Sequence, residues 1–275
     1  MKIAFLHDRH YLDYNGGAEL TTKYWYEKGI SQGHDITLFS CNDEVSIDYD
    51  FYLIGNHIDF QNKQCFKEIV NNKKYGLVVH NSNPMSHLVE LYEKAHLIIW
   101  IAPDQHLEYK INHKNTLIKP CYIDHSQFYN MNQDREDIQV YIGEIAPHKV
   151  TKIMLNEMIE NQDQKYHLYG STQNYPDYVR FLDQLPNVNI GLQATTPQQV
   201  NLLYNRYKTF FWKLDRYGSF GRTNIEAMLA GCEMNVNKEN FGLFKYDINW
   251  DSRDDIINWL ENELNTFWQN ILDKL

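Results

Sequence analysis

The chain has 275 residues, of which 43% are hydrophobic and 14% aromatic, and its formal net charge is −10. This apolar content supports a sizeable buried core, which excludes a disordered tail or a fibrous protein. The negative charge argues against a general affinity for nucleic acid or anionic membrane, because binding to phosphate depends on clusters of Lys and Arg.

The amino terminus and the cysteines favour a soluble, cytoplasmic protein. Only a short apolar run separates Lys2 from His7, and no run of about 20 apolar residues follows, so we expect neither a signal peptide nor a membrane span. The four cysteines are scattered without a C-x-x-C pair, which argues against a disulfide framework or a zinc site.

Short apolar runs alternate with helical patterns along the chain, which is typical of βα units around parallel sheets. In the first half, the expected strands are Lys2–Leu6, Ile36–Ser40, Phe51–Ile54, Leu77–His80 and Leu97–Ile101. The expected helices of this half are Ala18–Ser31, Phe60–Asn71 and Ser86–Ala95.

The first βα turn contains Gly16 and Gly17, directly before a helix. Glycines allow a close approach of the backbone, and the N–H groups at a helix N-terminus favour an anion. Two glycines that merely make a tight turn explain the pattern equally well.

A polar, irregular segment after Pro120 separates the two halves, and the alternation of strands and helices then begins again. The expected strands are Ile138–Ile142, His167–Tyr169, Val188–Ile190, Thr209–Trp212 and Glu233–Val236. The expected helices are Lys149–Glu160, Asp177–Gln184, Pro197–Asn205, Asn224–Ala230 and an amphipathic segment from Asp254 to Leu275.

The most informative segment is Tyr217–Gly231, in which a glycine-bearing turn precedes a short helix with Glu226 in its expected first turn. Such a turn presents N–H groups to a phosphate, and a carboxylate accepts hydrogen bonds from vicinal hydroxyls. A phosphate together with a diol describes a nucleotide sugar. Thr223 and Glu226 also have the spacing of a capping box, which is an alternative role for the carboxylate.

This segment resembles the donor-binding loop of the retaining glycosyltransferase family 4, whose pattern is Glu-x-Phe-Gly-x-x-x-x-Glu. The resemblance implies that Glu226 contacts the ribose and that the turn holds the diphosphate. The turn residues in question are Gly218, Ser219, Phe220, Gly221 and Arg222.

Other segments resemble further motifs of this family. Gly143 to Lys149 is similar to its Gly-Arg-Leu-x-x-x-Lys-Gly motif, which implies that Lys149 neutralises the diphosphate. The turns at Gly170 and Leu192 resemble those beneath the nucleotide and at the base edge, and the Gly16-Gly17 turn resembles its Gly-Gly-x-Glu. The segment between the halves is similar to the interdomain segment of the family.

The chain departs from the family pattern at two positions. Gly218 stands where the first Glu of the loop contacts the transferred sugar, and Glu144 stands where an Arg neutralises the diphosphate. Arg222 or Arg216 is the candidate substitute cation, and Asp215 is a candidate to reach the sugar. These departures indicate a divergent member with an unusual sugar, or a relative without catalytic activity.

Family members often place a histidine near the reacting sugar, and several are candidates here. His80 follows one expected strand, and Asp104 and His106 follow the next. With twelve histidines in the chain, the sequence does not decide among them. Asp104, His106 and Lys149 are the candidate catalytic residues.

The resemblance implies an α/β protein of GT-B fold, with two Rossmann-like domains facing across a cleft. The expected domains are an acceptor domain at 1–124, a donor domain at 125–253 and a helix at 254–275 that packs near the interdomain region. The implied activity is retaining transfer of a sugar from a nucleotide diphosphate, without a metal or other cofactor, and with a UDP- or GDP-sugar as donor.

The acceptor and the assembly stay open. A glycan, a lipid-linked molecule, a protein or a small molecule could accept the sugar, and the oligomeric state is unknown. Two alternatives remain: a phage-type enzyme that glycosylates modified DNA bases, against which the charge argues, and a non-catalytic nucleotide-sugar binding or scaffold protein.

Overall fold

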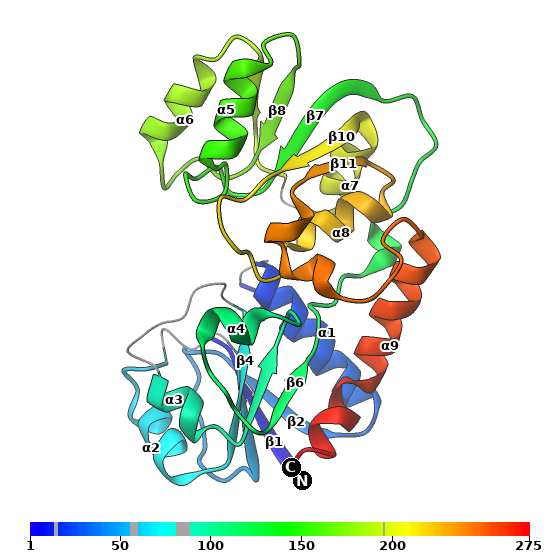
Figure 1. Ribbon diagram of the computed structural model, residues 1–275. Helices are drawn as coiled ribbons and strands as arrows, with labels where there is room; N and C mark the ends of the chain where they lie inside the picture. Colours follow the sequence, from blue (N-terminus) through cyan, green and yellow to red (C-terminus); the bar gives the residue numbers. More distant parts are fainter. Residues whose placement is uncertain (14–15, 56–59, 81–88, 195) are drawn as a thin grey trace. The chain divides into compact units, whose positions relative to one another are not determined.

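The computed structural model describes residues 1–13, 16–55, 60–80, 89–194 and 196–275. The chain divides into two compact units, residues 1–122 with 258–275 and residues 123–257. Each unit is built on one parallel sheet, of six strands in the first and five in the second, so the α/β class is confirmed (Figure 1).

The sheet of the first unit has the order β2-β1-β3-β4-β5-β6. Its strands are β1 (Lys2–Leu6), β2 (Asp35–Phe39), β3 (Phe51–Ile54), β4 (Tyr75–Val79), β5 (Leu97–Trp100) and β6 (Thr116–Ile118). Its helices are α1 (Gly17–Ser31), α2 (Gln64–Asn72), α3 (Val89–Lys94), α4 (Gln105–Tyr109) and most of α9 (Arg253–Leu272).

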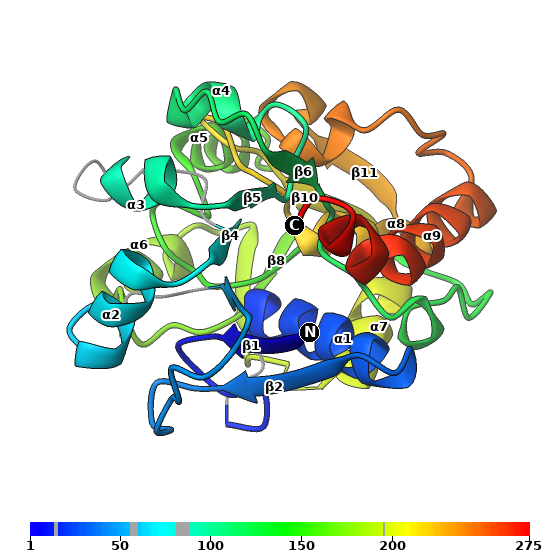
Figure 2. The ribbon, with the colours of Figure 1, turned by 90° about the horizontal axis from the view of Figure 1, so that it is seen from below.

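Helices cover both faces of this sheet, with α1 and α9 on one face and α2 and α3 on the other, as Figure 2 shows. The strands are therefore apolar on both faces, and all four residues of β3 are buried. On the α2 side, the core includes Tyr52, Ile54, Phe66 and Ile69.

The last helix, α9, holds the first unit together from the far end of the chain. Trp268 lies against the ring of Phe5 and donates a hydrogen bond from Nε1 to the carbonyl of Trp25 at 2.6 Å. Gly29 of α1 leaves the space for this indole, because a Cβ there would lie 2.4 Å from Nε1 of Trp268. Lys119, which is buried, forms an ion pair with Glu263 at 2.7 Å.

The sheet of the second unit has the order β11-β10-β7-β8-β9, which is the Rossmann order with β7 at the centre. Its strands are β7 (Glu136–Ile142), β8 (Tyr166–Tyr169), β9 (Val188–Gly191), β10 (Tyr207–Trp212) and β11 (Glu233–Val236). Its helices are α5 (Lys152–Glu160), α6 (Pro176–Asp183), α7 (Pro197–Arg206) and α8 (Arg222–Leu229), with short 3₁₀ turns at η2 (His125–Gln127), η3 (Lys238–Asn240) and η4 (Gly242–Lys245).

Most expected elements are present with ends shifted by a few residues. Three expectations about helix starts are wrong: α2 begins at Gln64 rather than Phe60, α5 at Lys152 rather than Lys149, and α8 at Arg222 rather than Asn224, with Gly221 as its N-cap. Thr223 therefore lies inside α8, so the capping box is excluded, and Glu226 lies beyond the first turn. No helix in the described parts of the chain is long and apolar enough to cross a bilayer.

Candidate functional site

The candidate site of the second unit lies at the carboxyl ends of β7, β8 and β10. In doubly wound sheets, ligands bind at this edge, where the strand order reverses. Here the order reverses beside β7, because β8 and β9 lie on one side of it and β10 and β11 on the other. Gly143, Gly170 and Trp212 are at this edge.

Gly143 and Gly170 bring two strand ends into direct backbone contact. A Cβ at position 170 would lie 1.5 Å from the carbonyl oxygen of Gly143, so no other residue fits without moving the backbone. The N–H of Gly143 donates to the carbonyl of Tyr169 at 2.9 Å. Both glycines were predicted donor-site residues, and the structure brings them together.

Lys149 lies in the turn between β7 and α5 rather than in the helix. Its Nζ is 5.9 Å from the ring centre of Trp212, and its backbone carbonyl accepts a hydrogen bond from Nε1 of Trp212 at 3.0 Å. Burial lowers the pKa of Lys149, whereas the charge of Glu144 raises it. No carboxylate among the described residues lies within 4.0 Å of this ammonium, so the charge remains available for an anion.

Glu144 replaces the expected arginine, but its carboxylate is engaged inside the unit. Oε1 accepts a hydrogen bond from Asn174 at 2.9 Å, and Oε2 lies 3.6 Å from Nε2 of His148. These contacts hold the negative charge beside His148, on the turn that also carries Lys149.

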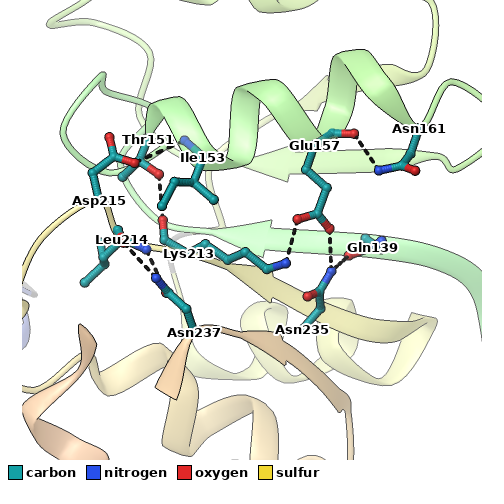
Figure 3. A network of polar contacts seen from close by, with 10 residues as sticks. All are labelled: Gln139, Thr151, Ile153, Glu157, Asn161, Lys213, Leu214, Asp215, Asn235 and Asn237. Carbon is teal, nitrogen blue, oxygen red and sulfur yellow. Dashed lines mark hydrogen bonds and ion pairs between the residues drawn. The ribbon is translucent and has the colours of Figure 1, made fainter. Parts of the chain in front are cut away.

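A polar network fixes the segment that leads from β10 to the predicted donor loop (Figure 3). Asp215 accepts hydrogen bonds from the N–H groups of Lys152 and Ile153, each at 3.1 Å, and so caps the start of α5. Lys213 forms an ion pair with Glu157 of α5 at 2.6 Å. Asp215 thus caps a helix. The sequence had suggested it as a residue that could contact the sugar.

The same network is anchored on β11. Asn235 donates hydrogen bonds to Gln139 at 2.7 Å and to Glu157 at 2.8 Å, and Asn237 binds both backbone groups of Leu214 (Figure 3). The segment before the loop is therefore fixed by α5 on one side and by β11 on the other.

The backbone of Gly218 is fully used within the chain. Its N–H donates to the carbonyl of Asn240 and its carbonyl accepts from the N–H of Gly242, both at 2.8 Å. A Cβ at this position would lie 2.4 Å from Cδ1 of Leu214. A side chain at position 218 would therefore have to displace the end of the Leu214 side chain.

Gly221 makes the turn into α8. Its φ of +78° lies in the left-handed region that favours glycine. A Cβ there would lie 2.7 Å from the side chain of Asn224 and 3.0 Å from the ring of Trp212. Trp212 therefore lies between this turn and Lys149, so one indole connects the start of α8 to the ammonium. Phe220 and Ser219, which precede the turn, are both buried.

Glu226 is buried in the second turn of α8 beside Arg222, with Oε1 3.8 Å from the guanidinium. Its other oxygen accepts a hydrogen bond from the hydroxyl of Tyr204 at 3.4 Å. Burial raises the pKa of Glu226, whereas Arg222 and the Tyr204 hydrogen bond lower it. Arg222 lies in the first turn of α8 and so adds positive charge where the N–H groups already favour an anion.

Leu192 follows β9 and is 93% exposed, so any contact with a base there would use its backbone or an open apolar surface. The predicted residues of the second unit are thus placed along one sheet edge, in the loops that follow it and in α8.

The remaining predicted residues lie in the first unit. Gly16 is the N-cap of α1, with φ −75°, and Gly17 is its first residue, so neither needs a left-handed backbone. Asp104 precedes α4 without capping it through its side chain, and His106 is half-buried on that helix. Of the loop after His80, residues 81–88 lie outside the described chain.

Sequence reasoning missed a buried pair at the carboxyl end of β1. His7 is 1% exposed, and its Nδ1 lies 4.0 Å from Oε1 of Glu19, which is also buried. The available signal was a His-Asp-Arg run directly after an apolar strand, which places polar groups at the edge where ligands bind.

No family model matches the sequence, and no curated protein matches it significantly. Solved structures do match over the whole chain. HepE from Anabaena, in complex with UDP and glucose, is 13% identical, with a TM-score of 0.69 and 100% of each chain covered. A glycosyltransferase involved in avilamycin A biosynthesis is 10% identical, with a TM-score of 0.67, covering 99% of this chain and 96% of that one.

A third structure is an α-glucosyltransferase in complex with UDP and a 13-mer DNA containing an HMU base. It is 12% identical, with a TM-score of 0.62, and the match covers 98% of this chain and 94% of that one. At these identities the likeness concerns the fold.

The chain has the GT-B fold. Two parallel α/β sheets and likeness over the whole chain to glycosyltransferase structures confirm this expectation. In this fold the second unit contributes the sheet edge at which Lys149, Trp212 and α8 meet.

Proposed function

We propose that the protein transfers a sugar from a nucleotide diphosphate donor to a hydroxyl acceptor. The observation that carries the proposal is the ammonium of Lys149, which has no carboxylate partner among the described residues and lies beside Trp212 and the Gly221 turn. A half-buried cation next to a helix N-terminus favours a multiply charged anion such as a diphosphate.

The carboxylate of Glu226 supplies an acceptor for sugar hydroxyls on the same helix. Charged groups that stabilise the departing diphosphate provide electrostatic catalysis, so Lys149, Arg222 and the N–H groups of the loop would lower the barrier to transfer. No step requires a metal in this proposal. HepE and the α-glucosyltransferase were both solved with UDP, which makes UDP-sugars the first donors to test.

Retention of the anomeric configuration is a further part of the proposal, and it rests on the resemblance of the donor loop to family 4. Proton NMR of the first-formed product tests it, because the coupling constant of the anomeric proton distinguishes the two anomers. An inverted product would contradict retention without contradicting transfer.

Thermal unfolding with UDP, GDP, ADP and CMP tests the nucleotide site. A nucleotide at about 100 times its Kd should stabilise the protein by about 2.7 kcal/mol, which corresponds to a rise of several degrees in Tm. Lys149→Met should remove most of this rise, whereas Lys152→Met, which deletes an exposed charge of the next helix, should leave it unchanged.

Release of UDP or GDP from a panel of nucleotide sugars then separates an enzyme from a binding protein. A Tm rise without any release would support the non-catalytic alternative. No Tm rise with any of the four nucleotides would contradict the proposal.

A further inference from the structure

The side chain of Asn224, in the first turn of α8, is buried without hydrogen-bond partners. The residue is 0% exposed, and among the described residues neither Nδ2 nor Oδ1 has a partner. Asn205, which is equally buried in the same unit, shows the usual situation. Its Nδ2 donates to the carbonyls of Tyr129 and Asn201, and its Oδ1 accepts from the N–H of Met131. The amide of Asn224 thus offers a donor and an acceptor that the fold does not use.

This amide points toward the amino end of α8. The Cα–Cβ bonds of a helix tilt toward its N-terminus. A Cβ built on the N-cap residue Gly221 would have Nδ2 of Asn224 as its nearest atom, at 2.7 Å, and the ring of Trp212 next, at 3.0 Å. Nζ of Lys149 lies 5.9 Å from the centre of that ring. The unpaired amide therefore lies at the helix end where N–H groups and an ammonium favour a diphosphate.

The chemistry of the amide indicates the kind of group that it binds. A phosphate oxygen accepts hydrogen bonds, so it can pair with Nδ2 alone. A hydroxyl both donates and accepts, so the hydroxyls of a sugar can pair with Nδ2 and Oδ1 together. A buried polar group of this kind discriminates strongly against a ligand that lacks the hydroxyl, because the group then stays unpaired.

A nucleotide sugar carries hydroxyls on both sides of its diphosphate, on the ribose and on the transferred sugar. The resemblance of the donor loop assigns Glu226 to the ribose. Asn224 and Glu226 are two residues apart, and side chains at this spacing do not share a face of a helix. With the diphosphate at the N-terminus of α8, Asn224 therefore faces away from the ribose and toward the transferred sugar.

The turn at Gly221 covers the amide. Gly221 has a φ of +78°, and glycine changes its backbone conformation at little steric cost. A shift of this turn on donor binding uncovers the amide of Asn224. Loop movements of this kind are common in enzymes that enclose their substrates.

We propose that the side-chain amide of Asn224 binds a hydroxyl of the transferred sugar, with Nδ2 donating and Oδ1 accepting. The amide thereby contributes to the choice of donor sugar. This inference rests on the proposed function and deepens it, and every residue that it uses belongs to the second unit.

The first test measures the Tm of the protein without ligand. Asn224→Leu adds volume and Asn224→Ala removes it, so a packing defect does not affect both variants alike. At least one of them should keep the wild-type Tm within about 2 °C, because no hydrogen bond is lost. Asn205→Leu, which breaks the hydrogen bonds of a paired amide, should lower the Tm by about 4 °C or more. A similar fall in both Asn224 variants would show that the amide has a partner without the donor, and would overturn the proposal.

The second test compares the Kd of UDP with that of UDP-glucose by calorimetry, or uses the UDP- or GDP-sugar that binds the wild type best together with its nucleotide. In the Asn224 variant that keeps the wild-type Tm, the nucleotide sugar should lose at least about fivefold in affinity relative to the free nucleotide. Asn161→Ala, at the carboxyl end of α5, should keep the wild-type ratio. A smaller change in the ratio, including an equal weakening of both ligands, would overturn the proposal.

Deoxy analogues of the same donor, each lacking one hydroxyl of the transferred sugar, identify the contact. One analogue should bind the wild type at least about fivefold more weakly than the full donor, but bind the Asn224 variant nearly as well as the full donor does. Losses that are additive at every hydroxyl would overturn the proposal. If the wild type binds neither nucleotide nor nucleotide sugar, the proposed function fails and this inference with it. A wild type that binds the donor without coupling to Asn224 contradicts this inference alone.

Discussion

At the scale of single residues, buried His7 and buried Glu226 make contributions to the free energy of unfolding that depend on pH in opposite directions. The folded state lowers the pKa of His7 from 6.5 to about 4, so it binds fewer protons there than the unfolded state does. Stability from this group is complete above pH 6.5 and is lost as the pH falls toward 4. Glu226 behaves in the reverse sense, because its pKa is raised by burial.

The His7 effect is measurable by urea unfolding at pH 7.5 and pH 4.5. Between these values the wild type should lose about 2–3 kcal/mol more than His7→Asn, since one pKa unit corresponds to about 1.4 kcal/mol. Equal losses in both proteins would show that His7 keeps an ordinary pKa in the folded state.

For Glu226 the expected result concerns a difference in Tm. A carboxyl with a raised pKa contributes stability below its unfolded pKa and loses it as the pH rises through the folded pKa. The Tm of Glu226→Gln minus that of wild type should therefore increase between pH 4 and pH 8. The same variant should lose the Tm rise with UDP, and a retained rise would exclude Glu226 from the nucleotide site.

Gly218 and Leu214 should be energetically coupled. Gly218→Ala places a methyl group against Leu214 and should cost about 1–3 kcal/mol of unfolding free energy, as for other overpacked sites. Leu214→Ala opens a cavity, and the double variant should be more stable than the sum of the two single costs predicts. A double-mutant cycle by urea unfolding measures this coupling, and strict additivity would mean that the two positions do not compete for space.

At the scale of elements, α5 depends on a cap that comes from another segment. Asp215 binds the first N–H groups of α5 from 62 residues further along the chain. Asp215→Ala should lower the unfolding free energy by about 1 kcal/mol, the usual effect of losing a helix cap. Asp183→Ala, which removes an exposed carboxylate at the end of α6, should change it by less than about 0.5 kcal/mol.

The cap also bears on the turn that carries Lys149, because that turn leads directly into α5. Asp215→Ala should therefore weaken the Tm rise with UDP as well as the fold. An effect on stability without any effect on UDP would show that the turn keeps its geometry without the cap.

The helices and strands also show which parts of the fold could be predicted from the sequence. The two sheets were predictable because apolar runs such as Phe51–Ile54 are buried on both faces and alternate with helical patterns. Strand β6 was missed because Thr116–Ile118 is short and partly exposed, so it lacks that apolar signal. The start of α5 was misplaced because its cap comes from a distant segment, which local patterns do not show.

For the candidate site, the sequence predicted the residues that match the family motif. The structure shows what surrounds the two residues that depart from it. Gly218 lies against the end of the Leu214 side chain, and the carboxylate of Glu144 is held by Asn174 and His148. The pairing of His7 with Glu19 was not predictable, because it depends on tertiary contacts and not on sequence spacing.

At the scale of the whole molecule, α9 belongs to both units. Its first residue, Arg253, donates hydrogen bonds to the carbonyls of Leu229 and Phe128 in the second unit. Residues from Asn258 onward belong to the first unit, where Trp268 packs against α1 and β1.

Trp268→Ala should therefore destabilise the first unit by about 3–5 kcal/mol, because it removes a fully buried indole. Limited proteolysis with mass spectrometry should show faster cleavage within residues 1–122, whereas UDP still protects residues 123–257. An equal increase in the rate of cleavage in both units would mean that the units unfold together.

The path of α9 also has a consequence for synthesis on the ribosome. The first unit begins at residue 1 but needs residues 258–275 for the helix that covers one face of its sheet, whereas the second unit is complete by residue 257. Domains generally fold as units while the chain emerges. The second unit is therefore the first that can finish folding, and the half of the protein that is made first must wait, with the apolar surface around Trp25 uncovered, until the last helix is released.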